Sequence, residues 1–384
     1  MLLYCKTLIS ELRKKKHGAA RLWFIGPMPP PIHGQSVYNT ALIEFLRHYR
    51  VPTCLPLGGT RSEKIAGALL LPLIMLFFAR RGDDVYTSPP GQGGVWAFLL
   101  TIAALRVRHL DHYVHHHSFR PINQSPALTA KLLTGVGGKY QHHIFLSDGM
   151  RERYAALYLS GQQQSQSLVL PNSFLFYEPI DDMPERSGPV TLGHLSVITR
   201  EKGIVYLMEL ADRLFQVRGD FRLVLAGPVR DPSLKEEILA FCARHPDKAV
   251  YLGPVYGKEK AAFYRAIDIF VLPSRLLDEA DPLVLLESYS SGCEVVASST
   301  GCIPERIRAG DRLLSFVPTD DCTLMGRIID QCNADRGSVC SMCVTHARRL
   351  YTDARQAAIR FFGALSISIP VNAFPDRSDK AQKL

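Results

Sequence analysis

Residues 266–305 contain the pattern that most limits how this chain can fold. The apolar run Ile269–Leu272, closed by a Pro-Ser pair, predicts a buried strand of a parallel sheet that ends in a loop. Asp281 and Pro282 then predict the start of a helix, with aspartate as the N-cap, and Gly292 predicts its end. A second apolar run follows as the next strand. This order is typical of open α/β sheets, which bind ligands at the carboxyl ends of their strands.

Two carboxylates belong to this unit, Glu279 in the loop and Glu287 within the helix, with seven residues between them. The start of the helix lies between them, and its backbone N–H groups lack intrahelical partners, which favours an anion such as phosphate. A loop glutamate and a glutamate in mid-helix are ordinarily solvated surface groups, and this is the alternative interpretation.

The whole frame resembles the E-x7-E signature of the family 4 glycosyltransferases, which are retaining enzymes with the GT-B fold. The Pro-Ser pair, LLE at the second glutamate, SGCEVVAS and GCIPE all agree with it. The resemblance implies an α/β protein with two Rossmann-like domains facing a cleft and a C-terminal helix crossing back to the first domain. It also implies that Glu279 holds the hydroxyls of the transferred sugar and Glu287 the ribose of the donor. Pro282, Leu283 and Val284 would contact the donor at the start of the helix.

A second segment of the C-terminal half, around Thr199–Gly203, resembles the region of that family that neutralises the donor diphosphate. Lys202 matches the family lysine. The family arginine five positions earlier is Val197 here, and Arg200 is the candidate replacement. Gly227, at the tip of the strand FRLVLAG, is also assigned to donor binding. Solvated loop cations are the alternative for the two basic residues.

The first half starts with a strand at Leu22–Gly26, a loop reading PMPPPIHGQS and a helix at Val37–His48. This order suggests a Rossmann-like beginning, although the sequence has no GxGxxG. The resemblance places the loop over the donor–acceptor cleft, where Gly34 lets the backbone approach the substrate. The paired glycine of the family is His33 in this sequence.

Histidines gather in the stretch HLDHYVHHHSF, which predicts a strand that ends in three of them. Successive strand residues point to opposite faces, which argues against their convergence on a metal ion. The family has a loop histidine that faces the sugar donor, and His116 fits it best, with His115 and His117 as its neighbours. An ordinary surface histidine is the alternative.

The net charge of +9 is unevenly distributed along the chain. Residues 1–175 carry 19 Lys and Arg against 8 Asp and Glu, whereas residues 176–384 carry 26 against 28. This asymmetry predicts an anionic partner for the first half. No nucleic-acid module pattern is present, so nucleic acid is not expected and an anionic membrane surface is preferred. The cluster Arg13–Lys16 fits such a surface or a solvated terminus.

Two apolar segments, residues 65–79 and 95–105, are expected to form helices. A membrane span needs about 20 residues, and Pro72 interrupts the first segment. Helices packed on the sheet are therefore favoured, and one of their faces could still contact lipid.

The length of 384 residues predicts two domains, and an apolar share of 47% is enough for two cores. The expected parts are an N-terminal Rossmann-like acceptor domain at 1–175, a linker at 176–188, a Rossmann-like donor domain at 189–345, a crossover helix at 346–371 and a disordered tail at 372–384.

Nine cysteines without a secretory signal predict a reducing cytosol. Cys332, Cys340, Cys343 and His346 resemble a metal cluster in composition, but only the CxxC has a regular zinc spacing. Buried thiols on a helix face are preferred, and a zinc site is the alternative.

Together these patterns predict a retaining glycosyltransferase that moves a sugar from a nucleotide-sugar to a lipid-linked or oligosaccharide acceptor. The resemblance places it in polysaccharide, O-antigen or exopolysaccharide assembly, in the cytoplasm at the inner face of the membrane. Cations and a helix start would stabilise the leaving diphosphate, so no metal and no cofactor are expected. A nucleotide-sugar epimerase with the same fold and an inactive membrane-surface scaffold are the alternatives.

Overall fold

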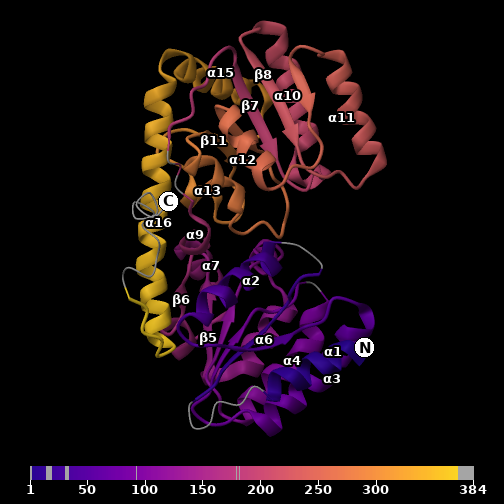
Figure 1. The fold of residues 1–384 in the computed structure, drawn as a ribbon, viewed down its shortest axis with the longest axis vertical. Coiled ribbons are helices and arrows are strands. Elements are labelled where there is room, and N and C mark those ends of the chain that lie inside the picture. Colours follow the sequence, from indigo (N-terminus) through magenta and orange to yellow (C-terminus); the bar gives the residue numbers. More distant parts are fainter. Residues whose placement is uncertain are drawn as a thin grey trace. The chain divides into compact units, whose positions relative to one another are not determined.

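The computed structural model describes residues 2–13, 20–30, 34–91, 93–178, 180 and 182–370. The chain divides into two compact units, each built on a parallel sheet covered by helices (Figure 1). Unit 1 comprises Met1–Leu175 and Ala354–Asp376, and unit 2 comprises chiefly Phe176–Asp353. His33, the lysines of the basic cluster and the tail 372–384 lie outside the described residues, so the expectations made for them stay predictions.

The sheet of unit 1 has six parallel strands in the order β2-β1-β3-β4-β5-β6. Its strands are β1 (Leu22–Gly26), β2 (Thr53–Pro56), β3 (Asp84–Thr87), β4 (His112–His115), β5 (Gln141–Phe145) and β6 (Leu168–Val169). Strands β1 and β4 are buried along their whole length, as expected for parallel strands covered on both faces.

The helices of unit 1 are α1 (Leu2–Arg13), α2 (Gly34–Arg47), α3 (Arg61–Phe78), α4 (Gly94–Val107), α5 (Arg120–Asn123), α6 (Leu128–Gly137), the 3-10 turn η1 (Gly138–Tyr140), α7 (Asp148–Tyr158), α8 (Gln162–Ser165) and α9 (Ser173–Phe176). Both expected apolar helices are present as α3 and α4. Helix α3 starts earlier than its apolar run because Thr60 and Glu63 form a capping box there. Pro72 is accommodated inside the helix.

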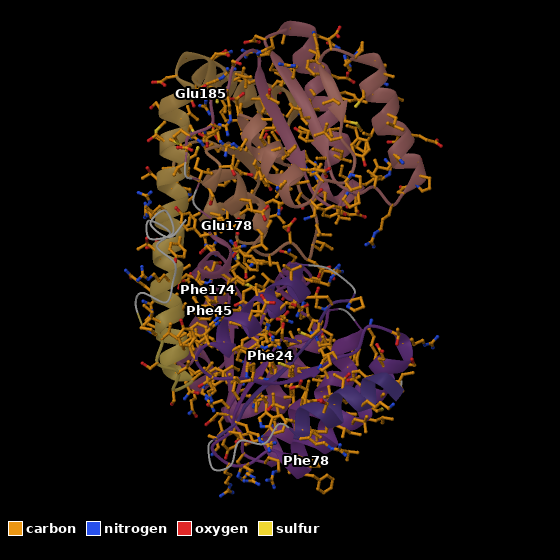
Figure 2. The ribbon with its side chains drawn as sticks, in the orientation of Figure 1. Phe24, Phe45, Phe78, Phe174, Glu178 and Glu185 are labelled. Carbon is orange, nitrogen blue, oxygen red and sulfur yellow. The ribbon has the colours of Figure 1, made fainter. Side chains whose placement is uncertain are left out.

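Helices α3, α4 and α6 pack side by side, and α1 packs against β2. Their inner side chains join the strands in one core, which includes Trp23, Met75 and Ile102. Figure 2 shows Phe24 inside unit 1 and Phe78 pointing away from it at the end of α3. None of the helices in the described part of the chain is both long enough and apolar enough to cross a bilayer.

The sheet of unit 2 has six parallel strands in the order β12-β11-β10-β7-β8-β9. They are β7 (Val190–Leu195), β8 (Phe221–Ala226), β9 (Ala249–Tyr251), β10 (Ile269–Leu272), β11 (Glu294–Ser298) and β12 (Leu313–Leu314). This is the doubly wound order of dinucleotide-binding folds, in which the direction of strand addition reverses between β7 and β10.

The helices of unit 2 are the 3-10 turn η2 (Arg200–Lys202), α10 (Ile204–Val217), α11 (Pro232–Arg244), α12 (Gly257–Ala266), α13 (Leu283–Ser290), α14 (Ile303–Arg306), α15 (Pro318–Ala334) and α16 (Arg336–Ala364). Helix α16 has 29 residues and begins in unit 2. Its last turns belong to unit 1, where the Phe362 ring lies 5.5 Å from Phe45 and the Tyr113 hydroxyl donates to the Ala364 carbonyl at 3.0 Å. The predicted returning helix is thus present.

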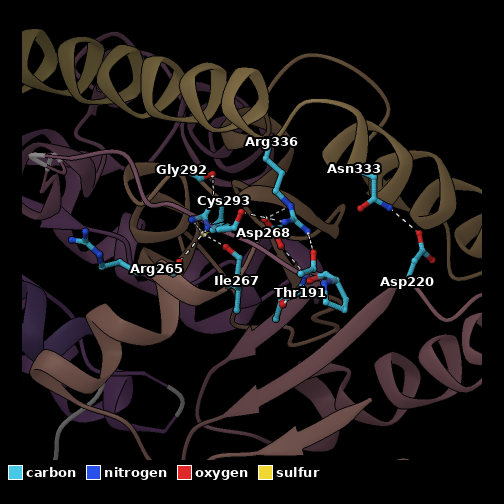
Figure 3. Close-up of polar contacts among 12 residues, drawn as sticks. Thr191, Asp220, Arg265, Ile267, Asp268, Gly292, Cys293, Asn333 and Arg336 are labelled. Carbon is cyan, nitrogen blue, oxygen red and sulfur yellow. Dashed lines mark hydrogen bonds and ion pairs between the residues drawn. The ribbon is translucent and has the colours of Figure 1, made fainter. Parts of the chain in front are cut away.

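Polar contacts fix the segment that enters β7 (Figure 3). Arg186 donates to the carbonyl of Gly292 at 2.9 Å and reaches further carbonyls around it. Asp268 accepts a hydrogen bond from the backbone N–H of Thr191 at 2.8 Å and pairs with Arg336. These partly buried contacts hold the first strand of unit 2 beside the strand β10 that precedes the candidate site.

The cysteines of the C-terminal region are buried thiols, as predicted. Cys332, Cys340 and Cys343 are buried, and burial raises the pKa of Cys332 to about 12. His346 bonds instead to the carbonyl of Arg306, at 2.8 Å. Across the described residues, no group of three or more His, Cys, Asp and Glu side chains could hold a metal ion.

Candidate functional site

A lysine and a glutamate meet at the point where the strand order of unit 2 reverses. Lys202 follows β7 and Glu279 follows β10, and Lys202 Nζ lies 2.6 Å from Glu279 Oε2. The Ser274 hydroxyl donates to the same oxygen at 2.8 Å. Both charged side chains are largely buried, so their contact is strengthened by the low local polarity. The two segments that sequence assigned to the donor are therefore in direct contact at the carboxyl ends of neighbouring strands.

Gly203 allows this approach of the two loops. Its φ is +79°, and a Cβ there would lie 1.9 Å from the carbonyl oxygen of Pro273. The backbone N–H of Arg275 also donates to the carbonyl of Glu201 at 2.7 Å. A side chain at position 203 would force the lysine loop away from the glutamate loop.

Gly227 is also required for close packing. Its φ is +122°, and a Cβ would lie 1.8 Å from the carbonyl oxygen of Ser196. Its N–H donates to the carbonyl of Gly253 at 2.7 Å. The glycine thus joins the loops that follow β7, β8 and β9, which accounts for its place in the sequence motif without a ligand contact.

The chain after β11 clamps the glutamate loop from the other side. Gly301, at φ +61°, allows its backbone to come so close that a Cβ would lie 2.4 Å from the Glu279 carbonyl oxygen. The Cys302 N–H donates to the carbonyl of Ala280 at 2.7 Å, and the Ser298 hydroxyl to that of Ser274 at 2.6 Å. The segments SGCEVVAS and GCIPE of the motif therefore position the loop that carries Glu279.

The prediction that Asp281 caps the following helix is wrong. Helix α13 begins at Leu283 with Pro282 as its N-cap, and among the described residues no side-chain cap is made there. Asp281 instead accepts from Arg306 Nε at 2.8 Å, in an ion pair whose side chains are mostly buried. The ion pair with Arg306, which is distant in sequence, takes the place of the local capping interaction that aspartate commonly makes. The helix start, including Val284, consequently keeps its positive potential.

Glu287 lies in α13 with both carboxylate oxygens engaged. Lys260 Nζ is 2.5 Å from Oε1, and the Tyr264 hydroxyl donates to Oε2 at 2.8 Å. Burial, followed by the charge of Glu287, raises the pKa of Tyr264 well above its ordinary value, so its hydroxyl keeps its proton. The carboxylate is therefore held in one orientation on the helix.

Arg200 has other partners. Its guanidinium pairs with Glu237 on α11 and lies 3.9 Å from Asp231, the N-cap of that helix. A second arginine, which sequence reasoning missed, lies closer along the chain to the glutamate loop. The Arg275 guanidinium stacks 3.9 Å from the ring centroid of Phe316 and is exposed to solvent. Its position directly after the Pro-Ser pair was the signal that could have identified it.

The histidine run of unit 1 lies mostly within the core. His116 is buried, its Nε2 lies 2.9 Å from Nδ1 of His143, and its ring stacks 4.9 Å from Phe145. Burial lowers the pKa of His116 to about 3, so the ring is neutral at neutral pH. His115 is fully buried against the Tyr86 hydroxyl at 2.7 Å, whereas His117, at the end of the run, is half-buried.

Gly34 is the first residue of α2 and is exposed. A Cβ there would meet none of the described atoms within 4 Å. The structure thus gives no packing reason for a glycine at this position within unit 1.

The sequence of unit 2 matches a known protein family. Residues 189–333 match the family described as Glycosyl transferases group 1. Over 124 residues, 32% of this chain, the sequence is 33% identical to the sulfoquinovosyl transferase SQD2 of Arabidopsis thaliana. That match covers 22% of the length of the relative. Matches to two further curated relatives cover 27% and 37% of their lengths, so the chain spans well under half of each of these proteins.

Solved structures resemble the fold over most of the chain. Anabaena Alr3699/HepE in complex with UDP superimposes with a TM-score of 0.65 and 14% identity, over 90% of this chain and 99% of that one. The lipopolysaccharide outer core galactosyltransferase WaaB in its apo form gives 0.63 and 15%, with the same coverage. The chain therefore has the GT-B fold, and its second unit carries the match to the group 1 glycosyl transferases.

Proposed function

We propose that this chain transfers a sugar from a nucleoside-diphosphate sugar to a glycan acceptor with retention of anomeric configuration. The observation that carries the proposal is the Lys202–Glu279 pair beside the start of α13, at the strand ends where doubly wound sheets bind ligands. The pair lies within the segment that matches the group 1 glycosyl transferases.

The chemistry follows from the charge that develops during transfer. When the anomeric C–O bond breaks, the bonding electrons stay with the diphosphate, whose terminal oxygen gains negative charge. Lys202 and the N–H groups of Leu283 and Val284 supply fixed positive potential for that charge. The lysine is paired with Glu279, so a diphosphate that binds it would compete with the carboxylate and leave Glu279 to accept from sugar hydroxyls.

Glu287 is proposed to hold the ribose of the nucleotide. A carboxylate has about four lone-pair sites, so it can accept ribose hydroxyls while Lys260 and Tyr264 fix its orientation. Because the HepE structure contains UDP, a UDP-sugar is the first donor to test.

The roles proposed for the remaining residues follow their surroundings. Because His116 is enclosed by Phe145 and bonded to His143, we propose the half-buried His117 as the ligand-contacting histidine of unit 1. Arg275, being exposed beside the glutamate loop, is a better candidate than Arg200 for a second cation on the diphosphate.

The acceptor is proposed to be a lipid-linked glycan at the inner face of a membrane. Its support is the excess of basic residues in 1–175 and the likeness of fold to a lipopolysaccharide galactosyltransferase. Turnover is proposed to need no divalent metal, because the positive potential comes from Lys202 and the start of α13.

The test has two stages. Thermal-shift measurements against a set of nucleoside diphosphates should identify one that stabilises the full chain, and turnover is then measured with the matching sugar donors, with and without EDTA. Lys202→Met should reduce the stabilisation, whereas Lys235→Met, at an exposed lysine on α11, should leave it unchanged. A nucleotide-linked sugar isomer as product would indicate an epimerase. No stabilisation and no turnover with any donor would refute the proposal.

A further inference from the structure

Two helices of unit 1 expose large apolar side chains on their outer sides. The apolar face is defined here as Leu69, Leu73 and Phe77 of α3 with Trp96, Leu100 and Val107 of α4, each between 47% and 76% exposed. The α3 residues recur every four positions, so they line one side of that helix. Helices α3 and α4 pack against each other, so the two rows lie on neighbouring helices.

The opposite sides of the same helices are already buried. Leu71 and Met75 of α3 and Ile102 and Leu105 of α4 belong to the core of unit 1. Both helices are therefore apolar towards the core and apolar outwards. A helix that is apolar all round is normally enclosed by apolar surroundings on every side, so the outer side calls for a second apolar medium.

The charges around the apolar face are predominantly positive. Arg61 and Lys64 lie at the start of α3, Arg80 and Arg81 follow its end, and Arg106 lies in the last turn of α4; all five are exposed.

The acids of the same region are committed to internal contacts. Glu63 accepts the N–H groups of Gly59 and Thr60, and Asp83 accepts those of Arg21 and the Trp23 indole. Glu63 is partly exposed and lies between Arg61 and Lys64, so five exposed cations face this one acid of the two helices. An apolar surface with a net positive surround is typical of helices that lie in the interface of anionic membranes.

We propose that the apolar face docks unit 1 onto an anionic lipid bilayer, with Leu, Phe and Trp side chains in the acyl region and the arginines at the phosphates. This deepens the proposed function by giving the lipid-linked acceptor a defined docking surface. Helix α3 has 18 residues and α4 has 14, about 27 Å and 21 Å at the α-helical rise, and both are short of the roughly 30 Å hydrocarbon core. The helices therefore lie in one leaflet rather than across it.

A second copy of the chain fits this face less well. In a twofold dimer the arginines around one apolar face would meet the same arginines of the other, and like charges in contact oppose association. Lipid phosphates meet the same arginines with opposite charge. A bilayer is thus the occupant that both the apolar and the charged residues favour.

The two tryptophans provide a built-in probe. Trp23 is fully buried, whereas Trp96 is half exposed on the apolar face, and the chain contains no other tryptophan. Vesicles of phosphatidylcholine with phosphatidylglycerol should shift the emission of the full chain to shorter wavelength and protect it from iodide. The Trp96→Phe variant should still co-sediment with the vesicles but lose the shift.

A matched pair of variants tests the surface itself. Leu69→Ser with Phe77→Ser removes two exposed side chains and should weaken partitioning into anionic vesicles by about 10- to 100-fold. Val217→Ser with Leu239→Ser, equally exposed on unit 2, should leave partitioning unchanged. Arg80→Ala with Arg81→Ala should weaken binding mainly at low salt, because the electrostatic part is screened.

Several outcomes would overturn the proposal. These are a chain that stays in the supernatant of anionic vesicles, equal losses in both paired variants, or a Trp96 shift that depends on protein concentration without vesicles. The thermal shift with nucleoside diphosphates is recorded on the same samples. Vesicle binding without nucleotide binding would support this surface and refute the proposed transferase function. Nucleotide binding without vesicle binding would refute this surface and support the proposed transferase function.

Discussion

Each of the two units has a sheet of six parallel strands, yet the groups at the carboxyl ends of the strands differ in chemistry between the units. In unit 2 those ends carry opposite charges in contact, Lys202 with Glu279. In unit 1 the strand β4 ends in imidazoles, and His115 and His116 are buried among aromatic rings. The sheet fixes where ligand-binding groups can stand, and the loops decide whether those groups are charged or neutral.

The outer surfaces differ as well. Unit 1 exposes large apolar residues at four-residue spacing along α3, beside those of α4, whereas the exposed apolar residues on the described helices of unit 2, such as Val217 and Leu239, form no such row. The exposed groups that distinguish unit 1 are therefore apolar, whereas unit 2 is distinguished by a largely buried ion pair at its strand ends.

The largest effect is expected from acid. Burial lowers the pKa of His112 to about 4 and of His116 to about 3, and lowers those of His115 and His143 well below the ordinary value. Between about pH 6.5 and 4 the unfolded chain binds protons that folded unit 1 excludes. These histidines therefore do not lower the free energy of unfolding above about pH 6.5, and they lower it progressively as the pH falls below that value. Each histidine contributes about 1.4 kcal/mol per pH unit in that window.

Unit 2 has fewer such groups, His194 and His346, so unit 1 should unfold at the higher pH. Both tryptophans belong to unit 1, and their fluorescence reports its unfolding alone, while hydrogen exchange monitored by mass spectrometry follows both units. Simultaneous acid unfolding of the two units, or earlier loss of unit 2, would break the contrast.

The next effect concerns turnover. Glu279→Gln keeps the shape of the side chain but removes the charge that orders Lys202, and misplacement of a reacting group commonly costs about 100-fold in rate. We expect a fall of that size in kcat/KM. Glu237→Gln, the same change on α11, should leave kcat/KM near that of the unmodified chain. Equal rates in both variants would remove Glu279 from the site.

A smaller effect is expected from the glycine that brings the loops together. Gly203→Ala strains a positive φ and places a methyl group 1.9 Å from the Pro273 carbonyl oxygen, at a cost of about 1–3 kcal/mol in the free energy of unfolding. Gly82→Ala in unit 1 has a similar φ of +89° but no described atom within 4 Å of its Cβ. Chemical denaturation of both variants separates backbone strain from the close approach, and equal losses would show that the approach contributes nothing.

The smallest effect is expected at Arg200. Its exposed pair with Glu237 is of the kind that contributes little, and it does not join the Lys202–Glu279 contact. Arg200→Ala should therefore leave the KM for donor almost unchanged, while Arg275→Ala should raise it. Donor titrations of initial rate measure both, and the reverse ranking would return Arg200 to the diphosphate site.

Sequence predicted the sheet and most helices because their signals are local, such as the buried run Ile269–Leu272 and the apolar run at 65–79. It misplaced Asp281 because the competing partner, Arg306, is 25 residues away and only tertiary packing brings it near. It missed Arg275 for a similar reason, since the stacking on Phe316 is not visible in the loop sequence. Alternation along β4 placed neighbouring histidines on opposite faces, but burial by Phe145 had to be seen in the structure.

The claim that unit 2 holds the donor at the Lys202–Glu279 pair is tested most directly by calorimetric titration of UDP into the full chain. We expect saturable binding to the unmodified protein and to Lys235→Met, and binding weakened at least about tenfold in Lys202→Met, since one charge-assisted contact to phosphate is lost. Equal affinity in all three proteins would contradict it, as would the absence of binding by UDP and by every other nucleoside diphosphate.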